Sequence, residues 1–496
     1  MDHEISLGAR LTELAELHPH DDAIVFAAAD GSERVITWAE LERGANNVAW
    51  ILHDRGVGVG SLVGIGLPKC LEHFAATFGA WKAGATVLSM SAGLPPWERT
   101  GILESIDASA IIADWEDEAG ALGRAELNLD GPSGDKTFPA LVPSPPVALC
   151  SGGSTGRPKV VMAPGSGTRT PGNTLGPIGQ LVGLRPRLTS LVTSPLYHNL
   201  GFYLTYLGVF DDNRTIVLER FDAARVLDLV ESQGVQWMSL VPTMMQRIIN
   251  VPGVRQRNLA SIERIIHTAA PCPAWLKEAW IELLGPERIC EVYSSSEQVG
   301  FCVISGDEWL AHRGSVGQPV FSELRVLDDR GERLPAGQVG ELFMRVLGTV
   351  GPAYEYAGSP RGRVTADGFA SIGDLGWVDD DGYVYLADRR SDLIISGGAN
   401  VYPAEVEAAL GEHAAVADVA VIGLPDQEWG QRVHAVLEAS PESEIPSDDA
   451  LREFCEQRLD RYKVPRSFEW MGRLPRNDAG KIRRSALAQE RHNKER

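Results

Sequence analysis

The order of apolar and polar positions predicts a chain in which strands and helices alternate. Residues 23–38 contain two apolar runs around Asp30-Gly31, a dipeptide typical of tight turns, and this predicts a hairpin. Residues 38–56 follow the helical period, while residues 63–90 and 100–116 each predict a strand, a helix and a strand. Such alternation is typical of largely parallel sheets that helices cover.

The middle of the chain continues this alternation. Apolar runs at residues 188–196 and 213–219 predict strands, and residues 223–244 predict a helix followed by a buried strand. Residues 261–271 predict a strand that ends in a turn of small residues. From about residue 320 the pattern changes to hairpins with Asp-Gly and Arg-Gly turns, which predicts an antiparallel β subdomain.

After Arg390 the elements become short and compact, with helix-like stretches at residues 405–413 and 451–461. A charged boundary near residues 389–392 lies between two β segments and suits a hinge. The sequence therefore predicts an α/β fold with a large N-terminal domain of residues 1–390, made of mostly parallel, helix-covered sheets and the β subdomain. A small, mobile α+β domain of residues 391–496 follows it.

Charge and cysteine usage narrow the class of protein. The chain has 46 Lys and Arg against 67 Asp and Glu, a formal net charge of −21 that repels nucleic acid and acidic membrane surfaces. Six scattered cysteines form no C-x-x-C pair, and the N-terminus lacks a signal peptide. We therefore expect a cytoplasmic protein with neither nucleic acid nor membrane as a partner.

A glycine-rich stretch follows the apolar residues 147–150. It has the composition of a loop that cradles phosphate, because its glycines allow close backbone approach and its hydroxyls and lysine add donors. The same letters fit the G-x-S-x-G elbow of serine hydrolases with Ser154 as nucleophile, although Pro158 disfavours the helix that this elbow needs. A plain surface loop is the third interpretation. The candidate ligand-binding residues are Ser151, Gly152, Gly153, Ser154, Thr155, Gly156 and Lys159.

Three further stretches carry candidate chemistry. In residues 293–297, hydroxyls next to Glu297 could bind Mg²⁺ and phosphate, although Ser and Glu at this spacing also start helices. Asp374, which lies between glycines, could accept two hydrogen bonds from a ribose diol, and Arg389 could add a donor. Lys481 follows Gly480 at a turn near the C-terminus and could reach into a cleft. Each of these is weak alone, since Asp-Gly turns and tail lysines are common.

In this order and spacing the stretches resemble the adenylate-forming superfamily of acyl-CoA synthetases, luciferases and peptide-synthetase adenylation domains. Residues 195–198 (PLYH) and 401–407 (VYPAEVE) add to the resemblance, which covers about residues 37–487. It implies that a carboxylate attacks the α-phosphate of Mg·ATP to give an acyl-adenylate and pyrophosphate. A nucleophile then displaces AMP.

The resemblance also implies roles for particular residues. Residues 151–159 would wrap the β- and γ-phosphates, Glu297 would hold Mg²⁺, and Asp374 with Arg389 would hold the ribose. Lys481 would bridge the attacking carboxylate and the nucleotide. The remaining nucleotide-binding positions are the turn of Ala269, Ala270 and Pro271 with Tyr293 around adenine, and Ser294, Ser295 and Ser296 beside the α-phosphate.

In the family the small domain rotates at a hinge, here Ser391, so that the face of Gly397 and Gly398 forms the tunnel for the nucleophile. Relatives often carry Asp or Lys at the hinge. Val160 and Ser294 also stand where glycine is usual, departures that we interpret as variation within the superfamily. His198 is expected to gate the nucleophile's path or deprotonate the nucleophile, or simply to pack against the ligand.

The wall of the acyl pocket is expected to be partly aromatic, which favours an aromatic or bulky acid. We therefore predict an acid–CoA ligase that uses ATP, Mg²⁺ and CoA, as a monomer or homodimer. The alternatives are an amide synthetase, a loader of a separate carrier protein, a serine hydrolase built on Ser154 and a silent nucleotide-binding protein. The polar ending ALAQERHNKER leads us to expect no fused carrier domain. The pocket residues are Tyr197, His198, Asn199, Phe202, Trp237 and Thr243.

Overall fold

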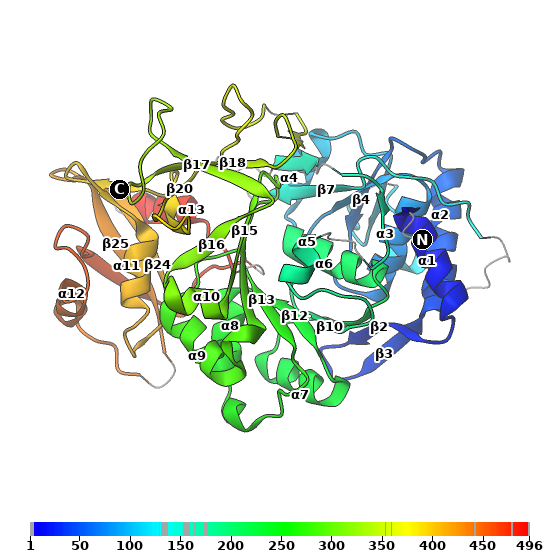
Figure 1. Cartoon of the computed structure of the whole chain (residues 1–496), viewed down its shortest axis with the longest axis horizontal. Helices are drawn as coiled ribbons and strands as arrows, with labels where there is room; N and C mark the ends of the chain where they lie inside the picture. Colours follow the sequence, from blue (N-terminus) through cyan, green and yellow to red (C-terminus); the bar gives the residue numbers. More distant parts are fainter. Residues whose placement is uncertain are drawn as a thin grey trace.

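The computed structural model describes residues 4–118, 120–127, 129, 137–151, 159–162, 165–172, 177–352, 354–358, 360–440, 443–477 and 480–494. Across these residues the chain forms two large sheets, a smaller C-terminal sheet and a short strand pair (Figure 1). None of the helices in this described part has the length and apolar character of a membrane span.

The largest sheet has 13 strands, and six neighbouring strands of it, from β14 to β2 in spatial order, run parallel. From β14 onward the neighbours run antiparallel, which forms the predicted β subdomain. In spatial order the strands are β17 (Ser322–Leu327), β18 (Gly340–Val346), β20 (Asp374–Val378), β21 (Val384–Arg389), β16 (Ser315–Val320), β15 (Phe301–Ser305), β14 (Ile289–Tyr293), β13 (Arg264–His267), β12 (Trp237–Leu240), β10 (Thr189–Val192), β11 (Arg214–Leu218), β2 (Asp22–Ala27) and β3 (Glu33–Thr37).

The second sheet has six strands, four of which are parallel. It consists of β19 (Glu355–Tyr356), β8 (Lys159–Met162), β7 (Val147–Ser151), β5 (Thr86–Ser89), β4 (Leu62–Gly66) and β6 (Ala110–Ala113). A separate pair joins β1 (Ile5–Ser6) to β9 (Thr168–Arg169).

Helices fill the space between the two large sheets and cover their outer faces. One buried cluster joins Val192 and Val217 of the 13-stranded sheet to Val63 and Val87 of the six-stranded sheet through these inner helices. The inner helices are α1 (Leu7–Leu17), α2 (Trp38–Asp54), α3 (Leu71–Lys82) and α6 (Asn199–Phe210); the outer face of the larger sheet carries α7 (Ala223–Gln233), α8 (Pro242–Ile249) and α9 (Ala274–Leu284), and α4 (Pro96–Glu104) packs on the smaller sheet. Short helices are α5 (Pro177–Leu181), α10 (Gly306–Ala311), η1 (Arg124–Leu127), η2 (Val254–Gln256) and η3 (Pro286–Arg288).

Local sequence explains where these helices start. Thr37 ends β3, and its hydroxyl accepts a hydrogen bond from the Glu40 amide at 3.3 Å. The Glu40 carboxylate accepts one from the Thr37 amide at 2.8 Å. This reciprocal cap satisfies two amides that have no partner inside α2, so the strand converts directly into the helix.

The C-terminal part has its own sheet and its own buried clusters, whose core residues all lie between Ile394 and Leu487. Figure 1 shows it in orange and red at the end of the molecule opposite the N-terminus. It contains β22 (Ile394–Ser396), β23 (Ala399–Val401), β24 (Val416–Asp426), β25 (Gly430–Ala439), β26 (Ser467–Met471), α11 (Pro403–Leu410), α12 (Asp448–Glu456) and α13 (Arg484–Lys494).

The structure confirms the predicted fold class and both antiparallel hairpins, since β17 pairs with β18 and β20 pairs with β21. One element prediction is wrong. Residues 100–104 end helix α4 and do not form a strand, because Pro95 and Pro96 start a helix that the following residues continue. The division at residues 390 and 391 stays a prediction.

Candidate active site

Three predicted nucleotide-binding residues meet where two strands end and a third begins. Asp374 begins β20 and Arg389 ends β21, and the antiparallel register places them opposite each other. The Arg389 Nε lies 3.3 Å from the Asp374 Oδ1. Tyr293 ends β14 and donates a hydrogen bond from its hydroxyl to the Asp374 Oδ2 at 2.7 Å. One hydrogen bond and one ion pair thus hold a phenol, a carboxylate and a guanidinium together.

The surroundings of Asp374 determine its charge state. The residue is 8% exposed, and burial raises the pKa of its carboxyl group, while the Arg389 guanidinium and the Tyr293 hydroxyl oppose this effect. Burial together with Asp374 raises the pKa of Tyr293 well above its ordinary value, so the phenol stays protonated and donates a hydrogen bond. A neighbouring donor can therefore hold the carboxylate in position for a diol.

The turn of Ala269, Ala270 and Pro271 directly follows β13. Ala269 has a φ of 75°, in the left-handed region that a side chain enters at a cost of roughly 1–2 kcal/mol. Close by, the buried Lys277 and Glu291 form an ion pair that links α9 to β14. This pair braces the strand that carries Tyr293 next to the strained turn.

Residues 294–297 form an irregular segment between β14 and β15. The Ser294 hydroxyl donates to the Gly300 carbonyl at 2.9 Å, and the Asn199 amide donates to the Ser295 carbonyl at 3.2 Å. Ser296 is partly buried in the same segment. The interpretation of this segment as a helix start is wrong, because strand β15 follows. The contacts instead hold the three serines and Glu297 at the end of β14.

A magnesium ion suits Glu297 if substrate phosphates share its coordination. Within the described ranges no three His, Cys, Asp or Glu side chains gather into a metal cage. Mg²⁺ is commonly bound by one or two carboxylates plus phosphate oxygens and water. The donor set therefore fits an ion that arrives with a nucleotide and does not fit a permanent all-protein site.

The ends of the predicted phosphate loop are adjacent. Ser151 ends β7 and Lys159 begins β8, and the two residues pair across the antiparallel register. The Lys159 Nζ lies 4.6 Å from the centre of the Tyr356 ring. The loop residues Gly152, Gly153, Ser154, Thr155 and Gly156 lie outside the described residues.

Lys481 sits on a turn that several hydrogen bonds hold. The turn closes through a bridge between Arg476 and Ile482. The Asn477 side chain accepts a hydrogen bond from the Lys481 amide at 2.9 Å, and the Arg476 guanidinium donates to the Gly480 carbonyl at 2.9 Å. These bonds fix the backbone from which the lysine side chain extends.

The electrostatic surroundings of Lys481 place its ammonium group beside the nucleotide-binding residues. Although the residue as a whole is exposed, loss of solvent around the ammonium lowers its pKa. Arg389 adds to this decrease, and the carboxylates of Asp374 and Glu297 oppose it. The charges of these nucleotide-binding candidates therefore act on the ammonium group of the C-terminal lysine.

The turn also touches the large N-terminal part of the chain. A methyl group added at Gly480 would lie 2.6 Å from the Thr243 hydroxyl of α8, and Gly480 has a φ of 72°. The Gln246 amide, one turn further along α8, donates to the Ala417 carbonyl of β24 at 2.8 Å. Thr243, expected in the acyl pocket, therefore lies against the lysine turn.

The other predicted pocket residues separate into two groups. Tyr197, His198 and Asn199 lie at the start of α6, where the rings of Tyr197 and His198 are 4.4 Å apart. Phe202 packs in the inner core, with its ring centre 4.6 Å from that of Tyr206. Trp237 is also buried, and its indole donates to the Val182 carbonyl at 2.9 Å. The start of α6 contacts the serine segment through the bond from Asn199 to the Ser295 carbonyl.

Ser391 follows β21 by two residues, and its hydroxyl donates to the Asp392 carboxylate at 3.2 Å. Gly397 and Gly398 form the turn between β22 and β23 with φ values of 58° and 82°. Positive φ at both positions is typical of a two-residue hairpin turn. A Cβ at Gly397 would lie 2.5 Å from the Trp429 ring, so the close approach requires glycine here.

Tyr356 contacts two predicted site residues, and the motifs did not point to it. Its hydroxyl donates to the Glu297 Oε1 at 2.8 Å. The local signal was the alternation of Tyr354 and Tyr356, which is typical of a short strand but not of a function.

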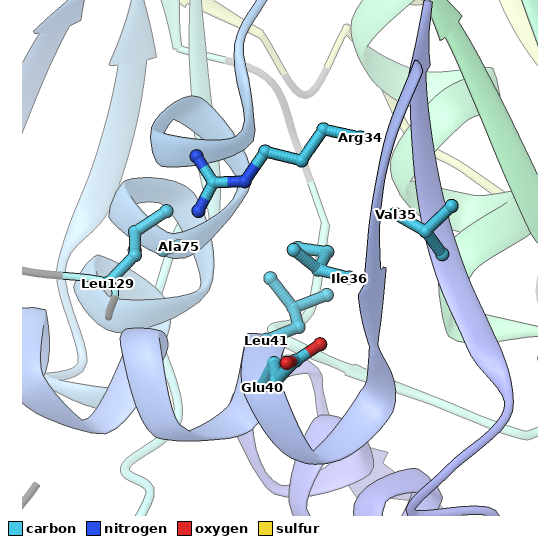
Figure 2. A pocket seen from close by; sticks show the side chains of 7 residues that line it. All are labelled: Arg34, Val35, Ile36, Glu40, Leu41, Ala75 and Leu129. Carbon is cyan, nitrogen blue, oxygen red and sulfur yellow. The ribbon is translucent and has the colours of Figure 1, made fainter. Parts of the chain in front are cut away.

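A cavity elsewhere (Figure 2) is lined partly by Ile36, Leu41 and Glu40, and the Glu40 carboxylate in it is already engaged in the cap of α2. The cavity lies at β3, one edge of the 13-stranded sheet, whereas β20 with Asp374 lies near the opposite edge.

Two family models match the chain, the AMP-binding enzyme model over residues 11–351 and the AMP-binding enzyme C-terminal domain over residues 405–481. The chain belongs to the AMP-binding enzyme family. It is therefore an adenylate-forming, ATP-dependent enzyme, as the sequence predicted.

Named relatives of this family cover nearly the whole chain. A feruloyl-CoA synthase from an Amycolatopsis species is 32% identical over 96% of this chain and 97% of its own length. The fatty acid–[acyl-carrier-protein] ligase ScoC of Streptomyces coeruleorubidus is 30% identical over 92% of this chain and 91% of its own. The o-succinylbenzoate CoA synthetase MenE of Bacillus subtilis, solved with its acyl-adenylate, has a TM-score of 0.81 at 28% identity and covers 98% of both chains.

Proposed function

We propose that this enzyme activates an aromatic or bulky carboxylic acid to its acyl-adenylate and transfers the acyl group to CoA. The feruloyl-CoA synthase and the o-succinylbenzoate CoA synthetase support this, because both named acids carry an aromatic ring. Tyr197 and His198 at the start of α6 provide aromatic surface next to the serine segment.

The observation that carries the proposal is the place of the lysine turn, where Gly480 lies against Thr243 of α8. There the charges of Asp374, Arg389 and Glu297 act on the Lys481 ammonium group. Two anions, a carboxylate and a triphosphate, must approach each other for adenylation to occur. A cation at their meeting point stabilises the charge that grows on the α-phosphoryl oxygens. An ammonium on a braced turn, close to a ribose-type clamp, has the position that this chemistry needs.

In the first half-reaction, a carboxylate oxygen of the acid attacks the α-phosphorus and the bond to the β-phosphate breaks, which releases pyrophosphate. Tyr293 and the turn after β13 would hold the adenine, and Asp374 with Arg389 would hold the ribose. The lysine at position 159 and the loop before it would bind the outer phosphates. Mg²⁺ at Glu297 would neutralise phosphate charge, and the serines at 294–296 would orient the α-phosphate.

In the second half-reaction, the CoA thiolate attacks the acyl carbon and AMP leaves. We propose that the part after residue 390 turns about Ser391, which withdraws Lys481 and brings in the turn of Gly397 and Gly398. The separate buried clusters of the C-terminal part support its movement as one body. His198 would then gate the entering thiol or accept its proton.

The reduced cysteines support a cytoplasmic enzyme, and we expect a monomer or homodimer.

The test is product analysis with a panel of acids, ATP and Mg²⁺, followed by addition of CoA. We expect AMP and pyrophosphate with each accepted acid, and a thioester once CoA is present. ADP as the nucleotide product would contradict adenylation. AMP without any thioester would remove the CoA proposal, and the same reactions with an amine or a carrier protein would then identify the acceptor.

A carrier protein is tested as an acceptor because the relative ScoC is named as a ligase that acts on an acyl-carrier protein. The serine hydrolase alternative predicts ATP-independent ester cleavage and labelling of Ser154 by a fluorophosphonate. A silent nucleotide-binding protein would bind ATP but exchange no labelled pyrophosphate into it.

A further inference from the structure

Tyr356 lies between the two segments that we propose to handle Mg·ATP. It belongs to the two-residue strand β19, which pairs antiparallel with β8 so that Tyr356 lies opposite Val161. The next residue, Ala357, donates a backbone hydrogen bond to the Val160 carbonyl at 2.9 Å. The tyrosine is therefore anchored two positions from Lys159, at the end of the phosphate loop.

The side chain of Tyr356 contacts both segments at once. Its hydroxyl donates to the Glu297 Oε1 at 2.8 Å. Its ring faces the Lys159 ammonium, with the Nζ 4.6 Å from the ring centre. A cation at this distance from an aromatic ring is attracted by the ring's negative face. Residues 138 positions apart in the chain, Lys159 and Glu297, are thereby held by one side chain.

Neighbouring groups hold the tyrosine ring in place. Tyr354 is fully buried, and its ring lies 5.1 Å from that of Tyr356 at an angle of 67°. Burial and the Glu297 carboxylate raise the pKa of Tyr356 above its ordinary value, so the phenol remains a donor.

We propose that Tyr356 is a positioning residue that orients the Glu297 carboxylate for the metal and holds Lys159 for the phosphates. Its hydrogen bond engages Oε1, and among the described residues Oε2 accepts no hydrogen bond. That arrangement turns one carboxylate oxygen toward an incoming cation. The inference rests on the proposed roles of Glu297 and Lys159 in binding Mg·ATP.

Two substitutions separate the two contacts. Tyr356→Phe removes the hydroxyl but keeps the ring, so it should disturb Glu297 and spare Lys159. Tyr356→Leu removes both contacts. Tyr385→Phe is the matched control, because the Tyr385 hydroxyl also donates to a carboxylate, that of Asp379 at 3.1 Å, without contact to these residues.

The readout is ATP binding by titration calorimetry at a series of Mg²⁺ concentrations, together with melting temperature. Tyr356→Phe should raise the Mg²⁺ concentration for half-maximal ATP binding roughly 10–100-fold, the loss expected for a hydrogen bond to a charged group. Affinity at saturating Mg²⁺ should stay within about twofold of the original. Tyr356→Leu should lower ATP affinity about 3–10-fold even at saturating Mg²⁺, because the ring contact is lost. Tyr385→Phe should change neither.

An unchanged Mg²⁺ titration in Tyr356→Phe would overturn the inference and leave the proposed function intact, provided that the parent enzyme still forms AMP. If the parent forms no AMP from any acid, the proposed function fails instead. If Tyr356→Phe also lowers the melting temperature, the double variant with Glu297→Gln decides. A merely structural tyrosine gives additive losses, whereas a positioning role through Glu297 gives no further rise in the Mg²⁺ requirement.

Discussion

Arg483, two residues after Lys481, donates a hydrogen bond to the Glu98 carboxylate of α4 at 2.7 Å. The Glu98 side chain is 7% exposed, whereas Arg483 is largely exposed. The bond joins the C-terminal part to the six-stranded half of the large N-terminal part. If the C-terminal part rotates as proposed, we expect this bond to break when the lysine turn leaves the site.

This pair predicts a selective effect of Arg483→Met. Adenylate formation should fall about 3–10-fold, because the buried Glu98 carboxylate loses its charged donor. The solvent exposure of Arg483 limits the size of this loss. Thioester formation from preformed acyl-adenylate should not fall. Pyrophosphate exchange and single-turnover thioester assays measure the two steps. Arg458→Met, whose pair with Glu412 lies within the C-terminal part, is the control and should affect neither step; equal losses in both steps would contradict the role.

Lys481→Ala should reduce acyl-adenylate formation by roughly two to three orders of magnitude, because one bridging cation is removed from the developing charge. The second half-reaction, started from synthetic acyl-adenylate, should be largely retained. Lys481→Arg restores the charge but not the geometry, so only partial recovery is expected. Comparable loss of both half-reactions would be inconsistent with a turn that serves one step.

Glu297→Gln keeps the size of the side chain and removes its charge. The Mg²⁺ concentration needed for half-maximal adenylation should rise about tenfold or more, because a neutral amide is a weaker ligand for a hard cation. AMP affinity without metal should stay the same, since Asp374 and Arg389, which we propose hold the ribose, are unchanged. A magnesium titration that matches the parent enzyme would remove the metal role.

Stability should decrease on acidification because of His73. This imidazole is buried on α3, with Nδ1 2.8 Å from the Tyr206 hydroxyl and Nε2 3.2 Å from that of Ser89. Burial lowers its pKa from 6.5 to about 4. The unfolded chain binds the proton first, so the contribution is complete above pH 6.5 and is lost as the pH falls toward 4.

The expected loss of unfolding free energy over that pH window is roughly 3 kcal/mol. Calorimetric melting temperatures of the parent and of His73→Gln, measured from pH 7 to pH 4.5, test it. The glutamine variant should start less stable and show a shallower decline. Parallel slopes in the two proteins would rule out His73 as the source.

Sequence reasoning succeeded where function and local structure depend on the same short stretch. An Asp-Gly turn predicted the hairpin of β20 and β21, and its register alone brings Asp374 opposite Arg389. It succeeded less where position depends on which face of a helix is buried. Phe202 points into the core because α6 lies between two sheets, so its aromatic character gave no information on the pocket.

Contacts between distant segments left no local signal at all. Thr243 meets Gly480 across the two parts of the chain, and no pattern near either residue specifies that approach. Tyr356 belongs to a strand of only two residues, whose partner lies almost 200 positions earlier in the chain. Periodicity needs several residues to be recognisable, so such a short strand escapes it.

The point at which β21 ends has a consequence for the fate of the activated acid. Arg389 is the last residue of that strand, and the proposed pivot comes two positions later. Rotation about that pivot would therefore leave Asp374 and Arg389 in place. The mixed anhydride could then stay bound between the two halves of the cycle. Such anhydrides hydrolyse readily in water. Their retention in the site would therefore limit the ATP consumed without product before the second substrate binds.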